Sequence, residues 1–224
     1  MGPTDEFELE ARRRGYRCIA GLDEAGRGPL AGPVVAAAVI LPTRCRLVGV
    51  DDSKQVSESE RARLYEVIVQ RARGVGVGVA TEQEIDRVNI LEATRLAMRR
   101  ALASLTPPAD CLLIDAVTLP DLAIPSRSII KGDTLSISIA AASIVAKVTR
   151  DRMMVAYHRT YPDYNFLSHK GYGTEEHLQR LAQHGPCAIH RRTFAPVAQL
   201  LSSNGGGAWP LSRTGLGESS GTIQ

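Results

Sequence analysis

The sequence predicts an α/β fold with one mixed, five-stranded sheet, helices on its flanks and a helical cap at the C-terminal end. Three observations support this prediction. Two apolar runs near the N-terminus are joined by a short turn, helical and strand-like stretches alternate between residues 57 and 131, and the regular stretches after residue 133 are helical. A sheet covered by helices accounts for this order of elements.

The composition indicates one globular domain in a reducing compartment. The chain has 224 residues, 44% of them hydrophobic and 23% charged, which suffices for one full core. A net charge of +3 excludes a large uniform basic field, so any nucleic-acid surface must be local. The four cysteines lie far apart, which indicates reduced thiols and not a zinc site. The longest apolar run is too short to span a membrane, and we expect a cytoplasmic protein.

The chain divides into three parts. Residues 1–16 are polar and are expected to form a short helical lead-in, with Arg12, Arg13 and Arg14 on a solvated face. Residues 17–201 carry the strand and helix signals of one domain. From residue 202 onward Gly, Ser and Thr dominate, so we expect residues 202–224 to be a disordered tail.

The first part of the domain is predicted to contain three strands and one helix. Residues 18–23 and 34–41 are apolar runs, and the short turn between them favours an antiparallel pair. The second run is apolar almost throughout, which is typical of a strand buried on both faces. Ser57 and Glu60 are spaced as a capping box that starts a helix. Alternating Gly and Val over residues 74–80 predict a third strand with close packing on one face.

The second part is predicted to contain two further strands among helices. Thr81 and Glu84 are spaced as another capping box, and Asn89 separates a short helix from a long one. The fourth and fifth strands are expected over residues 111–116 and 124–131.

After the fifth strand the sequence predicts helices only. Asp133 is expected to be the N-cap of a long helix, in which apolar residues recur at helical spacing up to Val148. The Ser-Ile-Ser-Ile start of this stretch also fits a strand, so its boundary stays open. Residues 161–173 are expected to form an irregular loop, and two shorter helices, near residues 174–185 and 193–201, complete the cap.

Two adjacent carboxylates, Asp23 and Glu24, stand at the end of the first strand, directly before the turn Gly26-Arg27-Gly28. Carboxylates bind magnesium or manganese, and an arginine between glycines suits a phosphate. Neighbours in an extended strand point to opposite faces, so both acids reach one site only if the strand bends. The alternative is one functional acid and one surface acid.

Asp115 and Asp133 each follow a strand-like stretch and complete a candidate set of four acids. Asp115 ends an apolar run, where a carboxylate needs a partner, and a salt bridge to an arginine is the alternative. For Asp133 alone, helix capping is the favoured interpretation. Four acids that converge from separate elements are what a two-metal phosphoryl-transfer site needs.

The remaining polar motifs have weaker implications. Lys147 and Asp151 are spaced as an ordinary helix-surface salt bridge. The loop from His169 to Gly173 suits contact with a nucleic-acid backbone or sugar, or is a plain surface turn. The sequence lacks the HExxH pattern of zinc hydrolases, a Walker loop and a G-x-S-x-G elbow.

In combination, these motifs resemble ribonuclease HII, a bacterial family of the ribonuclease H superfamily, and the resemblance covers roughly residues 16–201. Seven ordered blocks carry it: Gly21-Leu22-Asp23-Glu24-Ala25-Gly26-Arg27-Gly28-Pro29, Asp52-Ser53-Lys54, Leu113-Ile114-Asp115, Lys131-Gly132-Asp133, the stretch from Ala141 to Asp151, His169-Lys170-Gly171-Tyr172, and His184-Gly185-Pro186 with His190-Arg191-Arg192. The resemblance implies a ribonuclease H-like fold.

The same resemblance implies an endonuclease that cuts the RNA strand of RNA–DNA hybrids and incises duplex DNA on the 5′ side of single embedded ribonucleotides. It implies that Asp23, Glu24, Asp115 and Asp133 bind two divalent ions, Mn²⁺ or Mg²⁺, and that the products carry 3′-hydroxyl and 5′-phosphate ends. The partners implied are the hybrid and ribonucleotide-containing duplex DNA, and we expect a monomer. Residues 202–224 show no convincing motif for docking to a replication clamp.

The resemblance also assigns substrate-binding residues. Gly26, Arg27 and Gly28 resemble the loop that senses the ribose 2′-hydroxyl, Tyr172 resembles the tyrosine at the RNA–DNA junction, and Lys54 is a candidate for phosphate contact. Two departures stand beside these matches: Ala116 where glycine is common after the aspartate, and Val56 where leucine is common. Two competing functions are a catalytically idle hybrid-binding module and a junction resolvase on the same fold.

Overall fold

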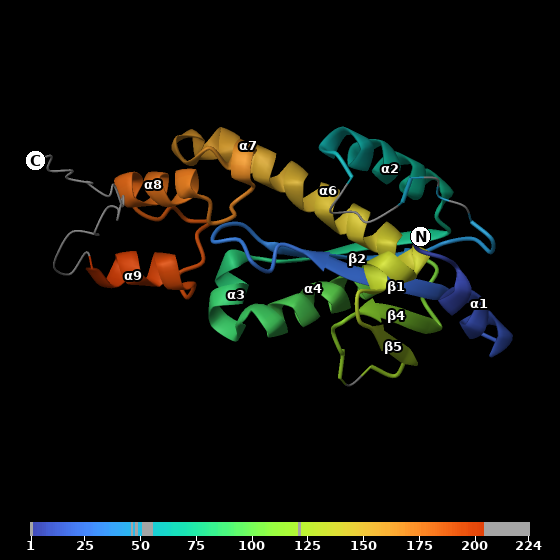
Figure 1. The fold of residues 1–224 in the computed structure, drawn as a ribbon. Helices are drawn as coiled ribbons and strands as arrows, with labels where there is room; N and C mark the ends of the chain where they lie inside the picture. Colours follow the sequence, from blue (N-terminus) through green and yellow to red (C-terminus); the bar gives the residue numbers. More distant parts are fainter. Residues whose placement is uncertain (1, 46, 48, 51–55, 121, 204–224) are drawn as a thin grey trace, which may run out of the picture.

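The fold is built on a mixed sheet with strand order β3-β2-β1-β4-β5, in a computed structural model that describes residues 2–45, 47, 49–50, 56–120 and 122–203 (Figure 1). The first three strands pair antiparallel, and β4 and β5 run parallel to β1. The five predicted strands are therefore confirmed, with these bounds: β1 Ile19–Ala25, β2 Val34–Ile40, β3 Gly74–Ala80, β4 Cys111–Asp115 and β5 Ser126–Ile129.

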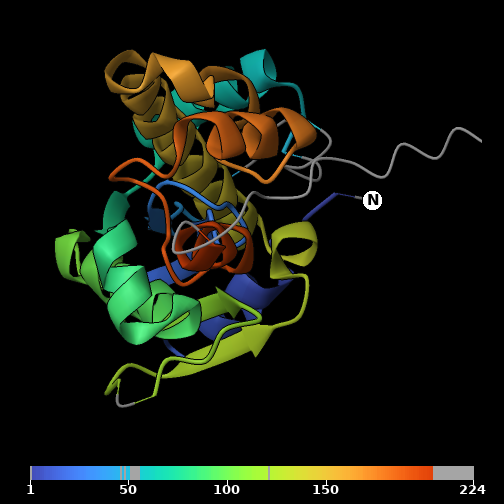
Figure 2. The ribbon, with the colours of Figure 1, turned by 90° about the vertical axis from the view of Figure 1, so that its left-hand side faces the viewer.

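Helices cover both faces of the sheet and both of its ends (Figures 1 and 2). On one face lie α2 (Glu58–Arg71) and α6 (Ile137–Thr160), and on the other lie α3 (Glu82–Val88) and α4 (Ile90–Ser104). At one end lies α1 (Glu6–Arg13), and the short α5 (Gly132–Leu135) joins β5 to α6. At the other end the cap comprises η1 (Pro162–Tyr164), α7 (Phe166–His169), α8 (Glu175–His184) and α9 (Ala195–Ser203).

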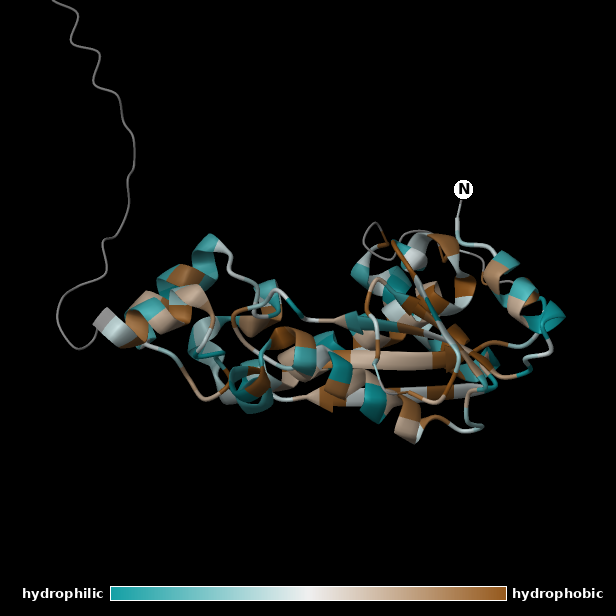
Figure 3. Ribbon diagram, turned by 90° about the horizontal axis from the view of Figure 1, so that it is seen from below, coloured by the Kyte–Doolittle hydropathy of each residue, from teal (hydrophilic) through white to brown (hydrophobic). Residues whose placement is uncertain are grey.

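The inner strand β2, which lies between β3 and β1, is buried on both faces, as its unbroken apolar run predicts. Ala36 and Ala38 pack into the core under α4, whereas Ala37 and Val39 pack into the core under α2 and α6. Hydrophobic residues accordingly gather along the strands, while hydrophilic and hydrophobic residues alternate along the helices (Figure 3). Within the described residues no helix is long and apolar enough to cross a membrane.

The glycines of β3 let α4 approach the sheet closely. A Cβ atom at Gly76 would lie 2.1 Å from the carbonyl oxygen of Ala101, and one at Gly78 would lie 2.0 Å from that of Ala97. Real Cβ atoms do not come so near to backbone. The predicted close packing on one face of this strand is thus confirmed, and its cause is the helix.

The local signals at helix starts are borne out in most cases. Thr81 and Glu84 form the complete capping box of α3, and Asn89 caps α4, so the two helices are separate as predicted. Ser57 accepts from the backbone N–H of Glu60 at the start of α2, whereas the Glu60 carboxylate accepts from the side chain of Arg63.

The prediction that Asp133 caps the long helix is wrong. Asp133 lies inside the short α5, and Ser136 is the N-cap of α6, where its Oγ accepts from the backbone N–H of Ile139 at 3.3 Å. Residues 161–173 contain η1 and α7 and are not wholly irregular. Since α9 reaches Ser203, the first two residues of the predicted tail are helical, and residues 204–224 lie outside the described residues.

The polar lead-in forms α1 and is tied to the segment between α5 and α6. The backbone N–H of Thr4 donates to Leu135 O at 3.0 Å, and that of Ile137 donates to Thr4 O at 2.9 Å. The buried carboxylate of Glu8 accepts from the hydroxyl of Ser136 at 2.6 Å and from the backbone N–H of Ser138 at 3.0 Å. The lead-in therefore supports the segment that carries Asp133.

Of the three arginines at the end of α1, Arg13 and Arg14 are exposed, as predicted. Arg12 is half-buried, and its guanidinium donates to the carbonyl oxygens of Arg17 and Leu41.

Candidate active site

Three of the four predicted acids converge at one end of the sheet. Asp23 lies near the end of β1, Asp115 is the last residue of the neighbouring parallel strand β4, and Asp133 lies in α5. One carboxylate oxygen from each lies within 4.8 Å of the others. Asp115 also accepts from the backbone N–H of Gly132 at 2.7 Å, which fixes α5 against β4.

Burial and mutual repulsion strain this cluster electrostatically. Asp23 is only 5% exposed. Burial, the charge of Glu24 and the charge of Asp115 hold the pKa of Asp23 well above its usual range. Hydrogen bonds from the side chain of Ser143 and the backbone N–H of Glu24 oppose this shift of the pKa in part. A cation beside the three carboxylates would relieve the repulsion.

Glu24 lies beside the cluster and not inside it. The pairing of β1 with β2 stays in register through Ala25, which turns Asp23 and Glu24 in different directions, yet the charge of Asp115 acts on both carboxyls, so Glu24 also lies near the cluster. Glu24 Oε1 accepts from the Arg27 guanidinium at 3.2 Å, and Oε2 is buried without a hydrogen-bond partner among the described residues. Burial raises the pKa of Glu24, Arg27 lowers it, and the charge of Asp115 raises it further.

The donor set fits a hard divalent cation. The ligand atoms are carboxylate oxygens only, which suits magnesium or manganese and not a soft metal. The unpartnered Oε2 of Glu24 is a second observation in favour, because a buried charged oxygen without a partner is costly. The residues present would therefore hold such an ion without further ligands from nitrogen or sulfur.

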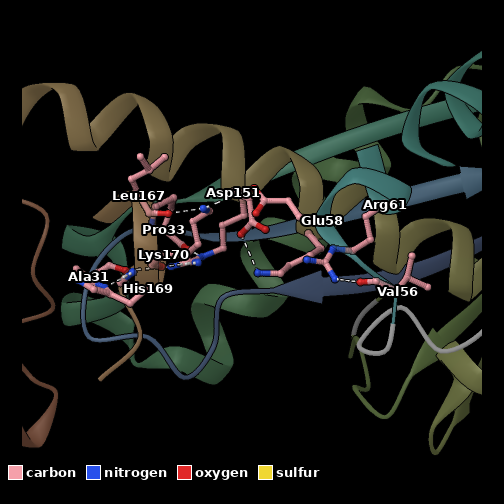
Figure 4. A network of polar contacts seen from close by, with 12 residues as sticks. Ala31, Pro33, Val56, Glu58, Arg61, Asp151, Leu167, His169 and Lys170 are labelled. Atoms are coloured by element: carbon pink, nitrogen blue, oxygen red, sulfur yellow. Dashed lines mark hydrogen bonds and ion pairs between the residues drawn. The ribbon is translucent and has the colours of Figure 1, made fainter. Parts of the chain in front are cut away.

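Arg150 of α6 holds the loop after β1 through hydrogen bonds to its backbone. Its side chain is fully buried and donates at 3.0 Å to each of three carbonyl oxygens, those of Ala31, Pro33 and Lys170 (Figure 4). Gly26 has a φ of +96°, and a Cβ atom there would lie 2.1 Å from Arg150 Nε. Glycine is thus required at position 26 by both its backbone conformation and its neighbour.

Arg191 clamps the same loop from the other side. Its buried guanidinium donates to the carbonyl oxygens of Gly26 at 2.5 Å, of Arg27 at 2.9 Å and of Gly32 at 2.7 Å. Burial and the charge of Arg150 lower the pKa of Arg191 to about 9, which the buried carboxylate of Glu82 partly opposes. The two arginines hold the backbone of the glycine turn in one conformation.

The side chains of the turn itself face outward. Arg27 and Gly28 are exposed, and a Cβ atom at Gly28 would meet no described atom within 4 Å. Tyr172 is 42% exposed, and its ring lies over two cations, 5.7 Å from Lys147 Nζ and 5.8 Å from Arg150 Cζ. These residues form an open surface beside the carboxylates.

The other predicted contacts have different outcomes. Lys147 and Asp151 form the expected ion pair at 2.8 Å. In the loop from His169 to Gly173, His169 and Lys170 are buried, so only Tyr172 and Gly173 face solvent. Lys170 Nζ donates to Leu167 O at 2.6 Å (Figure 4). Lys54 lies outside the described residues.

Sequence reasoning missed Ser143, Arg150 and Arg191 as parts of the site. Helical spacing marks Ser143 only as one position of an apolar helix, and Arg150 only as a neighbour of a surface pair. The carbonyl partners of Arg150 in the glycine loop lie 117 and 119 residues away in the chain. The one usable signal was their place in the blocks that carry the family resemblance.

Comparison with known proteins decides the family. The profile of ribonuclease HII matches residues 20–197. The chain belongs to the ribonuclease HII family. Ribonuclease HII of Geotalea uraniireducens is 54% identical to it over 88% of this chain and 92% of the relative. Ribonuclease HII of Bacillus subtilis is 56% identical over 85% of this chain and 74% of the relative.

A solved structure agrees with the family. Ribonuclease H2 from Pyrococcus horikoshii superposes with a TM-score of 0.70 at 26% identity, over 83% of this chain and 98% of that one. The resemblance seen in the sequence and the ribonuclease H-like fold are therefore confirmed. The protein is a ribonuclease H, and membership of the family implies endonuclease activity on RNA–DNA hybrids.

Proposed function

We propose that this enzyme hydrolyses the RNA strand of RNA–DNA hybrids and also incises duplex DNA on the 5′ side of single embedded ribonucleotides, with two divalent ions. The products would carry 3′-hydroxyl and 5′-phosphate ends. The observation that supports this proposal best is the convergence of Asp23, Asp115 and Asp133 within 4.8 Å, next to an exposed glycine turn.

The metal ions would be held by Asp23, Asp115 and Asp133, with Glu24 completing the set through its unpartnered Oε2. When bound, Mn²⁺ or Mg²⁺ supplies the activation of a water and the stabilisation of the leaving 3′-oxygen. The backbone bond from Gly132 to Asp115 and the Ser143 bond to Asp23 orient two of these carboxylates. The role of this chain is thus to place the carboxylates that would hold the ions, and a histidine base is not required.

Substrate recognition would fall to the exposed side chains around the cluster. Arg27 is free on its outer side to bind a phosphate, and Gly28 has no internal steric reason to be glycine, which supports close approach of a ligand backbone. The amides of this clamped turn would read the ribose 2′-hydroxyl, the group that separates RNA from DNA. Deoxyribose would leave those polar groups unpaired and is rejected for that reason.

Tyr172 would pack at the junction between RNA and DNA. Its exposed ring, supported from behind by Lys147 and Arg150, offers a flat face to a sugar or base. We propose that the protein acts as a monomer.

The decisive experiment is a gel assay on duplex DNA that carries one embedded ribonucleotide, with Mg²⁺, Mn²⁺ or chelator. We expect metal-dependent incision on the 5′ side of the ribonucleotide. Degradation of continuous hybrids alone would keep the metal site and remove the junction role of Tyr172 and Arg27. Cleavage of neither substrate would indicate a hybrid-binding module, and cleavage of a four-way DNA junction would indicate a resolvase.

A further inference from the structure

Three histidines of the C-terminal cap are buried and have no part in the proposed chemistry. His169 ends α7, His177 lies in the first turn of α8, and His190 lies between α8 and α9. Their exposed fractions are 7%, 0% and 2%. The rings of His169 and His177 stack with centroids 4.3 Å apart. Buried imidazoles need partners for both nitrogens, so their hydrogen bonds define what they do.

The bonds of His177 and His190 form one directed chain. The backbone N–H of Cys187 donates to His190 Nδ1 at 3.0 Å, so the proton of His190 lies on Nε2. That Nε2–H donates to His177 Nε2 at 3.1 Å, which leaves the His177 proton on Nδ1. The Nδ1–H of His177 then donates to the carbonyl oxygen of Tyr172 at 2.8 Å. The chain therefore ends on the backbone of the exposed tyrosine.

His169 holds the same tyrosine from its other side. The backbone N–H of Tyr172 donates to His169 O at 2.9 Å, and the N–H of Gly171 donates to His169 Nδ1 at 3.2 Å. His169 Nε2 in turn donates to Tyr164 O at 2.7 Å. Both backbone polar groups of Tyr172 are thus bound to histidines, and its carbonyl oxygen also accepts from the backbone N–H of Thr174 at 2.8 Å, although its side chain is partly exposed.

The His190 end of this series of hydrogen bonds is connected to the glycine turn. Arg191 follows His190 directly and donates to the carbonyl oxygens of Gly26 and Arg27. The backbone N–H of Arg191 also donates to Leu30 O at 2.9 Å. His190 and Arg191 together connect the two surfaces that the proposed function assigns to substrate, the turn at residues 26–28 and Tyr172.

We propose that His177 and His190 are positioning residues for Tyr172, and that they thereby set the preference of this enzyme for an RNA–DNA junction over a continuous hybrid. This inference rests on the proposed function of Tyr172. A metal site is not an alternative, because both nitrogens of each ring are already bonded within the protein. Burial also lowers the pKa of His177 to about 4 and that of His190 to about 3, so both rings are neutral donors at pH 7.

Two amide substitutions at His177 test its two hydrogen bonds separately. In His177→Asn the side-chain amide stands near the Nδ1 position and keeps a donor toward Tyr172 O. In His177→Gln the amide stands near the Nε2 position, keeps the bond to His190 and loses the bond to Tyr172. Tyr164→Phe is the matched control, because it removes a bond of the same cap, from Tyr164 OH to Gly185 O at 2.6 Å, that does not lead to Tyr172.

The measured quantity is kcat/KM on a single embedded ribonucleotide divided by kcat/KM on a continuous hybrid. We expect His177→Gln to lower this ratio by about tenfold or more, because small misplacements of a substrate contact are costly. His177→Asn and Tyr164→Phe should each change it by less than about threefold. In a Tyr172→Ala background, His177→Gln should lower the ratio no further, since the two act through one ring.

Equal losses on both substrates, or a ratio that His177→Gln leaves unchanged, would overturn the proposal. If His177→Gln does not fold, His190→Leu removes the preceding hydrogen bond, from His190 to His177. An unchanged ratio in that variant would overturn the proposal as well. A parent enzyme that does not incise at the ribonucleotide would overturn the proposed function of Tyr172 together with this inference. Incision by the parent with an unchanged ratio in the variants would overturn only the role of the histidines.

Discussion

Ala116 follows Asp115 directly and adopts a left-handed backbone conformation with a φ of 47°. An L-residue with a Cβ atom pays a conformational penalty there that glycine does not. The family resemblance leads one to expect glycine at this position, and the backbone supplies a reason. The strain lies next to a candidate metal ligand, where it fixes the direction in which the chain leaves β4.

We expect Ala116→Gly to stabilise the protein by about 1 kcal/mol, which corresponds to a rise in Tm of about 2–4 °C for a domain of this size. Thermal unfolding followed by circular dichroism measures it. Ala123→Gly is the control, because Ala123 is exposed and outside the positive-φ positions, and this change should lower Tm. A Tm for Ala116→Gly at or below that of the parent would show that the left-handed conformation is not strained.

Asp23 combines function with a cost to stability. Its folded-state pKa is raised by burial and by two neighbouring carboxylates, so the charged form is disfavoured at neutral pH in the metal-free protein. Stability linked to this group is therefore present at low pH and is lost as the pH rises through the folded pKa. Removal of the charge should relieve that loss.

We expect Asp23→Asn to abolish cleavage, to keep most of the hybrid affinity and to raise the Tm of the protein in chelator. Addition of Mn²⁺ should raise the Tm of the parent more than that of the variant, because the variant lacks one ligand. Asp163→Asn, at an exposed position, should change none of these values. Loss of hybrid binding in parallel with activity, or a metal-induced shift in Tm equal to the parent's, would contradict the assignment of Asp23 to a metal site.

The helix α1 shows how a peripheral element supports the site. Glu8 is 7% exposed, and its Oε1 accepts from the hydroxyls and the backbone around Ser136 and Ser138. Ser138 also lies against Gly21, where a Cβ atom would come within 2.1 Å of its carbonyl carbon. The start of α6 is thereby held between β1 and α1.

We expect Glu8→Ala to destabilise the protein by about 2 kcal/mol, because it leaves buried hydroxyl and N–H donors without an acceptor. Glu8→Gln keeps one acceptor oxygen and should recover most of that loss. Glu6→Ala, on the exposed side of the same helix, should stay within about 0.5 kcal/mol of the parent. Urea unfolding measures all three, and equal midpoints for Glu8→Ala and Glu6→Ala would show that the Glu8 bonds add nothing.

The sequence predicted those elements whose signals are local. Apolar runs identified all five strands, and the box at Thr81 and Glu84 located the start of α3. The same local rule failed at Asp133, since aspartate and serine both cap helices and only the contacts with α1 and β1 select Ser136. Asp23 and Asp115 were recognisable as candidate metal ligands because acids that follow apolar runs are conspicuous in sequence, whereas Asp133 joined the candidates only in combination with them.

Residues that act across long separations were not predictable in this way. Arg150 and Arg191 look like surface cations in sequence, yet both are fully buried. Their acceptors are backbone carbonyl oxygens, which every residue carries and which therefore leave no mark in the sequence. The same holds for His177, whose acceptor is the carbonyl of Tyr172.

These buried cations and neutral histidines make the cap and the sheet one body. Arg150 and Arg191 join the loop after β1 to the segments on either side of α8, and His177 and His190 join α8 to the chain that precedes α9. Every one of these bonds requires a particular protonation state. The stability of the whole molecule should therefore depend on pH through the cap as well as through the carboxylate cluster.

Burial lowers the pKa of His177 to about 4, against 6.5 for an unburied histidine. Below pH 6.5 the unfolded chain binds a proton that the folded protein does not, so stability is full above that pH and falls as the pH drops toward 4. Over this range the His177 contribution that is lost amounts to about 2–3 kcal/mol. His190 acts in the same direction and over a wider range, because its pKa is lowered to about 3.

We expect the free energy of unfolding in urea, measured in chelator so that no metal contributes, to decrease between pH 7 and about pH 4.5. In His177→Asn the decrease should be smaller, since an amide binds no proton in either state. His184→Asn is the matched control, because His184 is an exposed histidine of the same helix. Parallel curves for the parent and His177→Asn would mean that folding does not change the pKa of His177, which would contradict the effect of burial on this histidine.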